Sequence, residues 1–169
     1  ASIPNVSHMS VVSNLLANEF KYADVGLLDD THIHFFTYGE IARGLAVKGL
    51  LVRECKFTLM NKNDHHVRDV YQELEPDVLR HLYSRWHNYV CQYVVRVEKS
   101  SFGLDDLIAV NLDRMNIDDR NAPDEIKAYR NSLLSELGVS QSEMLANLHA
   151  DMSSVLRELR NAGVVEEAL

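Results

Sequence analysis

Eight histidines are the side chains of this 169-residue chain that first suggest chemistry. His32 and His34 alternate along the sequence and would point the same way from a strand. Together with His65 and His66, which follow an aspartate, they offer imidazole and carboxylate ligands for a metal ion. No HExxH or paired-cysteine pattern accompanies them, so the sequence assigns neither a metal site nor a cofactor. A metal-dependent hydrolase is the third of three functional hypotheses.

Nucleophilic catalysis has one candidate, the thiol of Cys91, because His87 would lie one helical turn before it. The chain contains no nucleophile elbow, phosphate-binding glycine loop or dinucleotide fingerprint. Adjacent carboxylates such as Asp105 and Asp106 diverge on any regular element, which suits a helix N-terminus better than acid–base catalysis. The sequence therefore favours binding over catalysis and predicts no catalytic residue.

Residues 131–148, NSLLSELGVSQSEMLANL, resemble the helix-turn-helix of phage repressors and Cro proteins. The resemblance is carried by a turn glycine and by apolar residues around it, namely Gly138, Leu133, Leu137, Val139 and Met144. It implies a second helix in the major groove, with base contacts from Ser140, Gln141, Ser142 and Asn147. Two positions depart from the family's pattern: Leu134 replaces a small residue and Asn147 an apolar one.

The charge of the same region supports another interpretation. From Pro123 onward there are eight acidic and four basic residues, a net charge of −4, which repels phosphate. The alternative is an αα-hairpin in which Gly138 ends one helix and Ser140 caps the next. A DNA-binding regulator is accordingly the second functional hypothesis.

Residues 76–97 are interpreted as a buried central helix around which the chain is organised. Their apolar residues recur at steps of three and four: Leu79, Leu82, Trp86, Tyr89 and Tyr93. Arg80, Arg85 and Arg96 would form a basic outer face, which we expect to contact a partner.

The other elements follow from apolar spacing and capping residues. Thr37 and Glu40 have the spacing of a capping box and should begin a helix. Further helices are expected at about 10–20, 64–74, 104–115, 123–137 and 141–162. Residues 52–60 alternate as a strand that would pair with 31–36 in a small N-terminal β-hairpin, with a continued helix as the alternative.

The last of these helices offers a second contact surface. Its apolar stripe keeps a heptad-like spacing and includes Met144, Leu148 and Met152, and methionine adapts readily to a partner. The stripe would pack on residues 76–97 within the chain, or on a copy of itself in an oligomer.

Composition sets the remaining expectations. Asp and Glu outnumber Lys and Arg by 25 to 17, and this net charge of −8 disfavours general binding to nucleic acid or anionic membranes. No apolar run is long enough to span a bilayer, and two isolated cysteines suit a reducing compartment, so a cytoplasmic protein is expected.

The sequence thus predicts a mainly α fold, a helical bundle of about six to seven helices with a small N-terminal β-hairpin as an accessory. Residues 1–9 are interpreted as a tag remnant or disordered leader and 10–169 as one domain, with a subdomain joint near 117–122. The leading functional hypothesis is a non-enzymatic interaction or assembly protein, an adaptor or accessory subunit, that binds a protein partner or itself.

Overall fold

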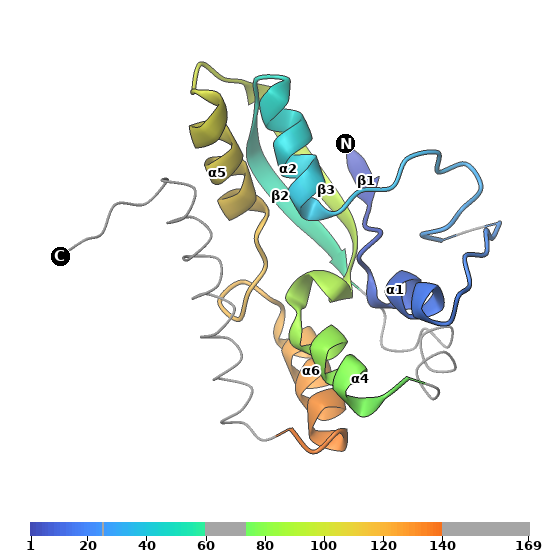
Figure 1. The fold of residues 1–169 in the computed structure, drawn as a ribbon. Helices are drawn as coiled ribbons and strands as arrows, with labels where there is room; N and C mark the ends of the chain where they lie inside the picture. The colour runs from blue at the N-terminus through green and yellow to red at the C-terminus, as the bar shows by residue number, and fades with distance from the viewer. Residues whose placement is uncertain (25, 60–73, 140–169) are drawn as a thin grey trace.

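The computed structural model describes residues 1–24, 26–59 and 74–139 (Figure 1). In chain order the elements are β1 (Ser2–Pro4), α1 (Met9–Leu16), α2 (Tyr38–Val47), β2 (Leu50–Leu59), α4 (Pro76–Ser84), the 3-10 helix η2 (Trp86–Tyr89), β3 (Val90–Lys99), α5 (Leu104–Met115) and α6 (Asp124–Glu136). The described residues therefore hold five α-helices and a three-stranded sheet. The predicted mainly α, all-helical bundle of six to seven helices is wrong, because the chain is a mixture of α and β structure.

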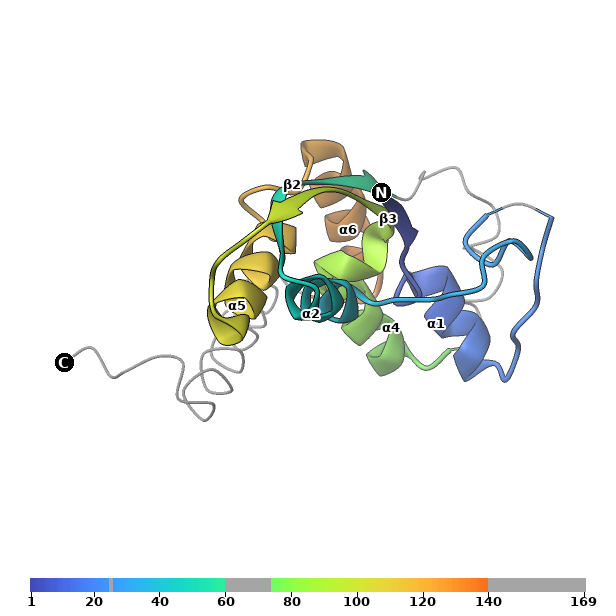
Figure 2. The same cartoon turned by 90° about the horizontal axis from the view of Figure 1, so that it is seen from above.

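The sheet is antiparallel, with the strand order β1-β3-β2. Ser2 lies opposite Val94 on one side of β3, and Phe57 lies opposite Tyr93 on the other. Helices α2 and α5 pack against each other and against β2, and Figure 2 shows them together on one side of the strands. The opposite face is solvated and carries ion pairs, for example between Arg96 and Glu54 at 3.3 Å.

The predicted central helix 76–97 is wrong beyond its first nine residues. Helix α4 ends at Ser84, and after η2 the chain becomes β3. In this second half Tyr93 and Val95 are buried while Val94 and Arg96 are exposed, so the side chains alternate with period two. Valines are stiff at χ1 and fit a pleated sheet better than a helix, and the steps of three and four among the aromatic residues are coincidental.

The last carbonyl groups of α4 accept hydrogen bonds from side chains that lie outside the helix. The Nδ2 of Asn88 donates to Leu82 O at 2.9 Å, and Nε and Nη2 of Arg130 donate to Tyr83 O and Ser84 O, both at 3.2 Å. Because Arg130 comes from α6, these bonds also fasten α6 to the end of α4.

The predicted hairpin between 31–36 and 52–60 is also wrong. Residues 31–36 form no strand, and only Phe36 makes an isolated bridge, with Asn5. The strand expected at 52–60 is confirmed as β2, but its partner is β3. The alternation of His32 and His34 indicated a strand, yet no other segment among the described residues forms a hydrogen-bonded ladder with this one.

Several helices are confirmed. Helix α2 begins after Thr37, whose side chain accepts a hydrogen bond from the Glu40 N–H at 3.4 Å, the first half of the predicted capping box, while the Glu40 carboxylate pairs with Arg43 at 2.8 Å. Helices α5 and α6 match the expected ranges 104–115 and 123–137 within two residues. Gly138 follows α6 with φ +73°, a left-handed conformation in which glycine is free of Cβ strain. The helices expected at 64–74 and 141–162 lie outside the described residues.

Residues 1–9, expected to be a tag remnant or a disordered leader, are part of the fold. They supply the edge strand β1, and the fully buried Asn5 donates through Nδ2 to His87 O and Val90 O, both at 2.8 Å. The expected joint near 117–122 is likewise packed, because Ile117 and Ala122 belong to the main hydrophobic cluster.

The main hydrophobic cluster connects the sheet to helices α4 and α6. It runs from the inward face of the sheet to α4 and α6, through Val52, Tyr93, Trp86 and Leu134. A smaller cluster of Ala46, Leu51 and Leu107 fills the far end, between α2 and α5. No side chain of residues 17–24 or 26–36 belongs to either cluster.

Candidate interaction surface

The most chemically suggestive group among the described residues surrounds His87, at the start of η2 and close to β3. Its Nδ1 lies 2.8 Å from the Tyr93 hydroxyl, and its Nε2 lies 3.3 Å from Asn116 Oδ1. Tyr38 stacks on the imidazole with ring centroids 3.7 Å apart and an angle of 1° between the planes. Because an amide oxygen only accepts, Nε2 carries the proton and Nδ1 accepts from Tyr93.

The surroundings keep this group uncharged. Burial lowers the pKa of His87 to about 4, against the opposing effect of its hydrogen bond to Asn116. Burial also raises the pKa of Tyr93 well above its usual range, and it raises that of Cys55 to about 11. A neutral imidazole, a protonated phenol and a protonated thiol are the reverse of the charge states of an activated nucleophile and base.

The Cys91–His87 pair expected from helical spacing is wrong, because residues 85–91 do not form one α-helix. Cys91 lies on β3, and both ring nitrogens of His87 contact other side chains.

The three arginines expected to form one basic face are separated. Arg80 lies on α4 and donates to Leu137 O at 2.8 Å, while Arg85 is the residue that follows the helix. Arg96 lies on β3, paired with Glu54 on the solvated face of the sheet. The predicted shared face required a helix through residue 97, which the structure does not have, and a contact of these arginines with a partner stays a prediction.

Other predicted site residues lie outside the described part of the chain: Met144, Leu148, Met152, Ser140, Gln141, Ser142, Asn147, His65 and His66. Their roles stay predictions. Of the remaining histidines, His32 places Nδ1 3.2 Å from Leu27 O, and the His34 ring faces Phe36. Within residues 1–24, 26–59 and 74–139, no three His, Cys, Asp or Glu side chains are grouped to hold a metal ion.

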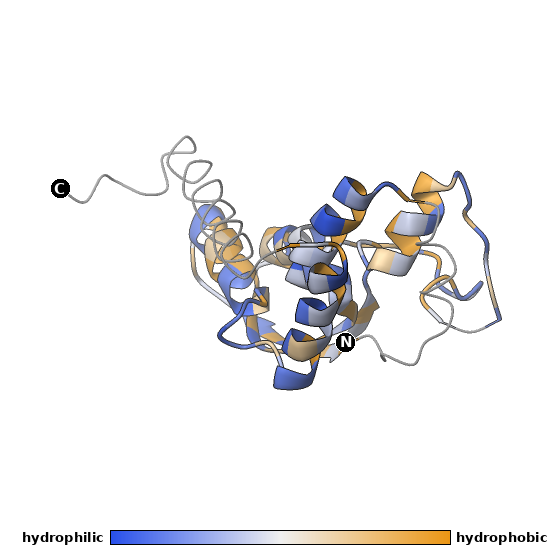
Figure 3. Cartoon of the chain, turned by 90° about the horizontal axis from the view of Figure 1, so that it is seen from below, coloured by the Kyte–Doolittle hydropathy of each residue, from blue (hydrophilic) through white to orange (hydrophobic). Residues whose placement is uncertain are grey.

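A different segment has the features of a binding site. We name residues 17–24 and 26–36 the aromatic loop; it connects α1 to α2 and lies at one side of the molecule (Figure 1). Figure 3 shows hydrophobic stretches on α1 and along this loop. Large apolar side chains are exposed here and at the end of α1: Leu15 by 50%, Leu16 by 53%, Phe20 by 41%, Tyr22 by 56%, Ile33 by 81% and Phe36 by 38%.

The aromatic rings of this loop pack on one another. Phe20 meets Tyr22 edge to face at 5.5 Å and meets Phe35 in the same way at 5.8 Å, while Tyr22 and Phe35 are 6.3 Å apart. These distances and angles are those of favourable aromatic pairs. The rings therefore form a joined apolar surface, although their outer parts remain in solvent.

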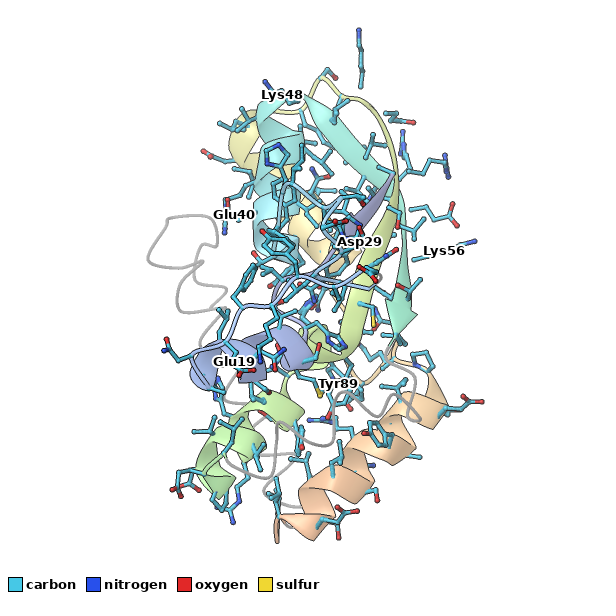
Figure 4. The ribbon with its side chains drawn as sticks, turned by 90° about the vertical axis from the view of Figure 1, so that its right-hand side faces the viewer. Glu19, Asp29, Glu40, Lys48, Lys56 and Tyr89 are labelled. Carbon is cyan, nitrogen blue, oxygen red and sulfur yellow. The ribbon has the colours of Figure 1, made fainter. Side chains whose placement is uncertain are left out.

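Backbone hydrogen bonds give the loop a defined shape. Ala23 N donates to Leu28 O at 2.9 Å, and Asp30 N donates to Ala23 O at 3.3 Å, which folds the loop on itself. At its end, Val6 N donates to Phe36 O at 3.0 Å and ties the loop to the residues after β1. Figure 4 looks onto this side of the molecule, with Glu19 and Asp29 labelled.

The loop is acidic. It contains Glu19, Asp24, Asp29 and Asp30 against one basic residue, Lys21, whose Nζ pairs with Glu19 at 2.8 Å. The Thr31 hydroxyl and backbone N–H donate to Asp29 Oδ1 at 2.6 and 2.8 Å, and these bonds lower the pKa of that carboxyl. The other two aspartates pair with no basic side chain among the described residues, so the aromatic surface is bordered by uncompensated negative charge.

Sequence reasoning did not identify this surface. It predicted a helix at about 10–20, which would include Phe20, but α1 ends at Leu16. It assigned 31–36 to a strand. The available signal was the density of aromatic residues between 20 and 38 without a sustained period of 2 or 3.6, which is unusual for a connection.

Within the described residues, no helix has both the length and the apolar character needed to cross a bilayer. Comparison with protein-family patterns identifies no family that matches this chain, and comparison with curated proteins identifies no matching relative.

Proposed function

We propose that this chain is a non-enzymatic interaction or assembly protein, and that the aromatic loop with the end of α1 binds its protein partner. One observation carries the proposal: large apolar side chains stand in solvent on a segment that contributes nothing to either hydrophobic cluster of the described residues. Neither cluster of residues 1–24, 26–59 and 74–139 includes these aromatic side chains, so packing within that part of the fold does not account for them. Exposed apolar surface of this kind is typical of protein–protein contacts.

The size of the surface supports this assignment. Taking about 200 Å² for one aromatic side chain, the exposed fractions of Phe20, Tyr22 and Phe36 leave on the order of 300 Å² of aromatic surface in water. Leu15 and Leu16 extend it. An interface typically buries about 800 Å² on each partner, so the loop would form its apolar centre and neighbouring polar residues its rim.

The cysteines support the compartment that we propose. Neither Cys55 nor Cys91 is joined in a disulfide, and burial raises the pKa of the Cys55 thiol, which lowers its reactivity. We place the protein in the reducing cytoplasm, where such thiols persist.

Site-specific photo-crosslinking tests the proposal. A photoreactive phenylalanine analogue placed at Tyr22 should yield a discrete adduct in extracts of the source cells, and the same analogue at Phe102 serves as a control. Phe102 is 53% exposed, in the connection between β3 and α5, outside the aromatic loop. The crosslinked protein is then purified and its affinity is measured by calorimetry.

The double variant Phe20→Ser/Tyr22→Ser should abolish that affinity, and Phe102→Ser should keep it. Light scattering over a range of concentrations tests self-association through the same residues. If no purified protein binds and the chain is a monomer throughout, or if the double variant binds normally, the proposal is wrong.

A further inference from the structure

We infer that the partner segment bound by the aromatic loop is positively charged, with arginine side chains among large apolar residues. The inference rests on the proposed function and adds the chemistry of the partner. Its basis is the juxtaposition of exposed aromatic rings with carboxylates that have no Lys or Arg partner within the described part of the chain.

Charge complementarity is the first argument. The aromatic loop has four acidic residues and one basic residue, and the only basic residue is already paired with Glu19. Asp24 and Asp30 are exposed and Asp29 partly so, and all three lie within nine residues of Tyr22. An acidic partner would meet like charges at the rim, whereas a basic one would be attracted and oriented there.

The second argument concerns the rings. A guanidinium group stacks on the face of an exposed Tyr or Phe ring and can donate to a carboxylate at the same time. The chain itself uses this contact, because the guanidinium carbon of Arg130 lies 4.5 Å from the centre of the Trp86 ring. The loop offers Tyr22 with an exposed carboxylate two residues away, at Asp24.

The third argument is that these groups are positioned before binding. The fold of the loop brings residue 23 beside 28–30, so the carboxylates of Asp24, Asp29 and Asp30 border one short turn rather than an extended chain. A partner loses less conformational entropy when it binds a shaped loop than when it must order one.

Two labelled peptides of about 15 residues are the probes. Each has leucine at helical spacing; one carries arginine at its polar positions and the other glutamate. Fluorescence anisotropy with the full chain should show saturable binding of the arginine peptide and at least tenfold weaker binding of the glutamate peptide. Raising the NaCl concentration from about 50 to about 300 mM should weaken the first interaction.

Substitutions in the aromatic loop then test which residues bind the arginine peptide. Asp24→Asn/Asp29→Asn/Asp30→Asn keeps side-chain oxygens, including the acceptor used by Thr31, and should raise the dissociation constant of the arginine peptide by about tenfold. Phe20→Ser/Tyr22→Ser should abolish binding, and Phe102→Ser should leave it unchanged. Circular dichroism and thermal melting confirm that each variant is folded.

These measurements give different results if only the basic character of the partner is wrong and if the proposed binding function itself is wrong. If the glutamate peptide binds as tightly and still requires Phe20 and Tyr22, or if light scattering shows a second copy bound through them, the loop is an interaction surface and the inference is wrong. No binding of the arginine peptide, or an unchanged affinity in the triple variant, also overturns the inference. The proposed function is then decided by crosslinking at Tyr22.

Discussion

Mild acid should destabilise the protein through His87. This side chain is neutral in the fold, packed between Tyr38 and Tyr93, and its pKa is lowered to about 4 by burial. In the unfolded chain it returns to its ordinary pKa of 6.5. Between these values the unfolded state binds more protons than the folded state, so a falling pH favours unfolding. The stabilisation is complete above about pH 7 and declines until about pH 4.

The two pKa values set the size of the effect. From about pH 7 to about pH 5, the linkage relation gives a loss of about 2 kcal/mol in the free energy of unfolding. Most aspartates and glutamates stay ionised over this interval, because their ordinary pKa values are near 4. Glu54 and Glu98 have pKa values lowered further by hydrogen bonds from Arg96 and Arg53, so their contributions fall at lower pH.

Urea denaturation at the two pH values measures this loss. His87→Gln removes the titrating group and should reduce the loss by about 2 kcal/mol, even if the variant is less stable at neutral pH. His34→Gln changes an exposed histidine in the aromatic loop and should keep the full loss. If His87→Gln loses as much stability as the unmodified protein, the buried neutral imidazole is not the cause and the reasoning is refuted.

Three further substitutions test how the elements are joined, each by urea denaturation at neutral pH. Arg130→Met should cost about 3 kcal/mol, because Ser84 O loses its arginine donor, Tyr83 O keeps only the Tyr89 hydroxyl, and Asp119 loses its ion pair; Arg130→Lys should cost less. Asn111→Ala should cost about 2 to 3 kcal/mol, because Val52 N and Leu50 O at the edge of β2 lose their side-chain partner, whereas the exposed Asn131→Ala should stay within about 0.5 kcal/mol. Thr37→Ala removes the N-cap of α2 and should lower the free energy of unfolding by about 0.5 to 1 kcal/mol. The loss is small because the hydrogen bond to Thr37 is long, at 3.4 Å. Equal effects of the two asparagine changes, or no effect of Arg130→Met, would contradict these assignments.

The sequence predicted an element correctly where the residues that begin it are neighbours in the chain. Helix α2 begins at a threonine with a glutamate three residues later, and α5 begins with two aspartates at its first turn. These devices act between neighbours in sequence, so the chain reveals them without a fold.

The helix predicted over residues 85–97 was wrong for the opposite reason. Two carbonyl groups at the end of α4 accept from Arg130, which lies more than 40 residues later in the chain, and the strand that follows α4 is fixed by pairing with β1 and β2. Apolar residues at 86, 89 and 93 fit a helical stripe, while those at 93, 95 and 97 fit a strand. A single sequence contains both periods, and tertiary pairing decides between them.

Asn111 shows the same dependence within the sheet. Its Oδ1 accepts from Val52 N at 2.8 Å and its Nδ2 donates to Leu50 O at 2.9 Å, so a helix side chain satisfies the free edge of β2. In sequence this asparagine interrupts the apolar face of α5 and carries no sign of a partner some 60 residues earlier. Buried polar residues of this kind specify how elements meet, and their partners can only be found in the fold.

The aromatic loop was misread for a separate reason. In residues 85–97 two regular patterns competed, and the fold selected one of them. In the loop neither pattern holds: Leu28 is buried, but the rings of Phe20, Tyr22 and Phe35 pack on one another outside both hydrophobic clusters. Periodicity reports how a segment packs on its own core, so it is uninformative where the side chains have no core partner. Aromatic residues outside both clusters are best explained by a partner, and this is why we propose the loop, rather than the histidines or the arginines, as the binding surface.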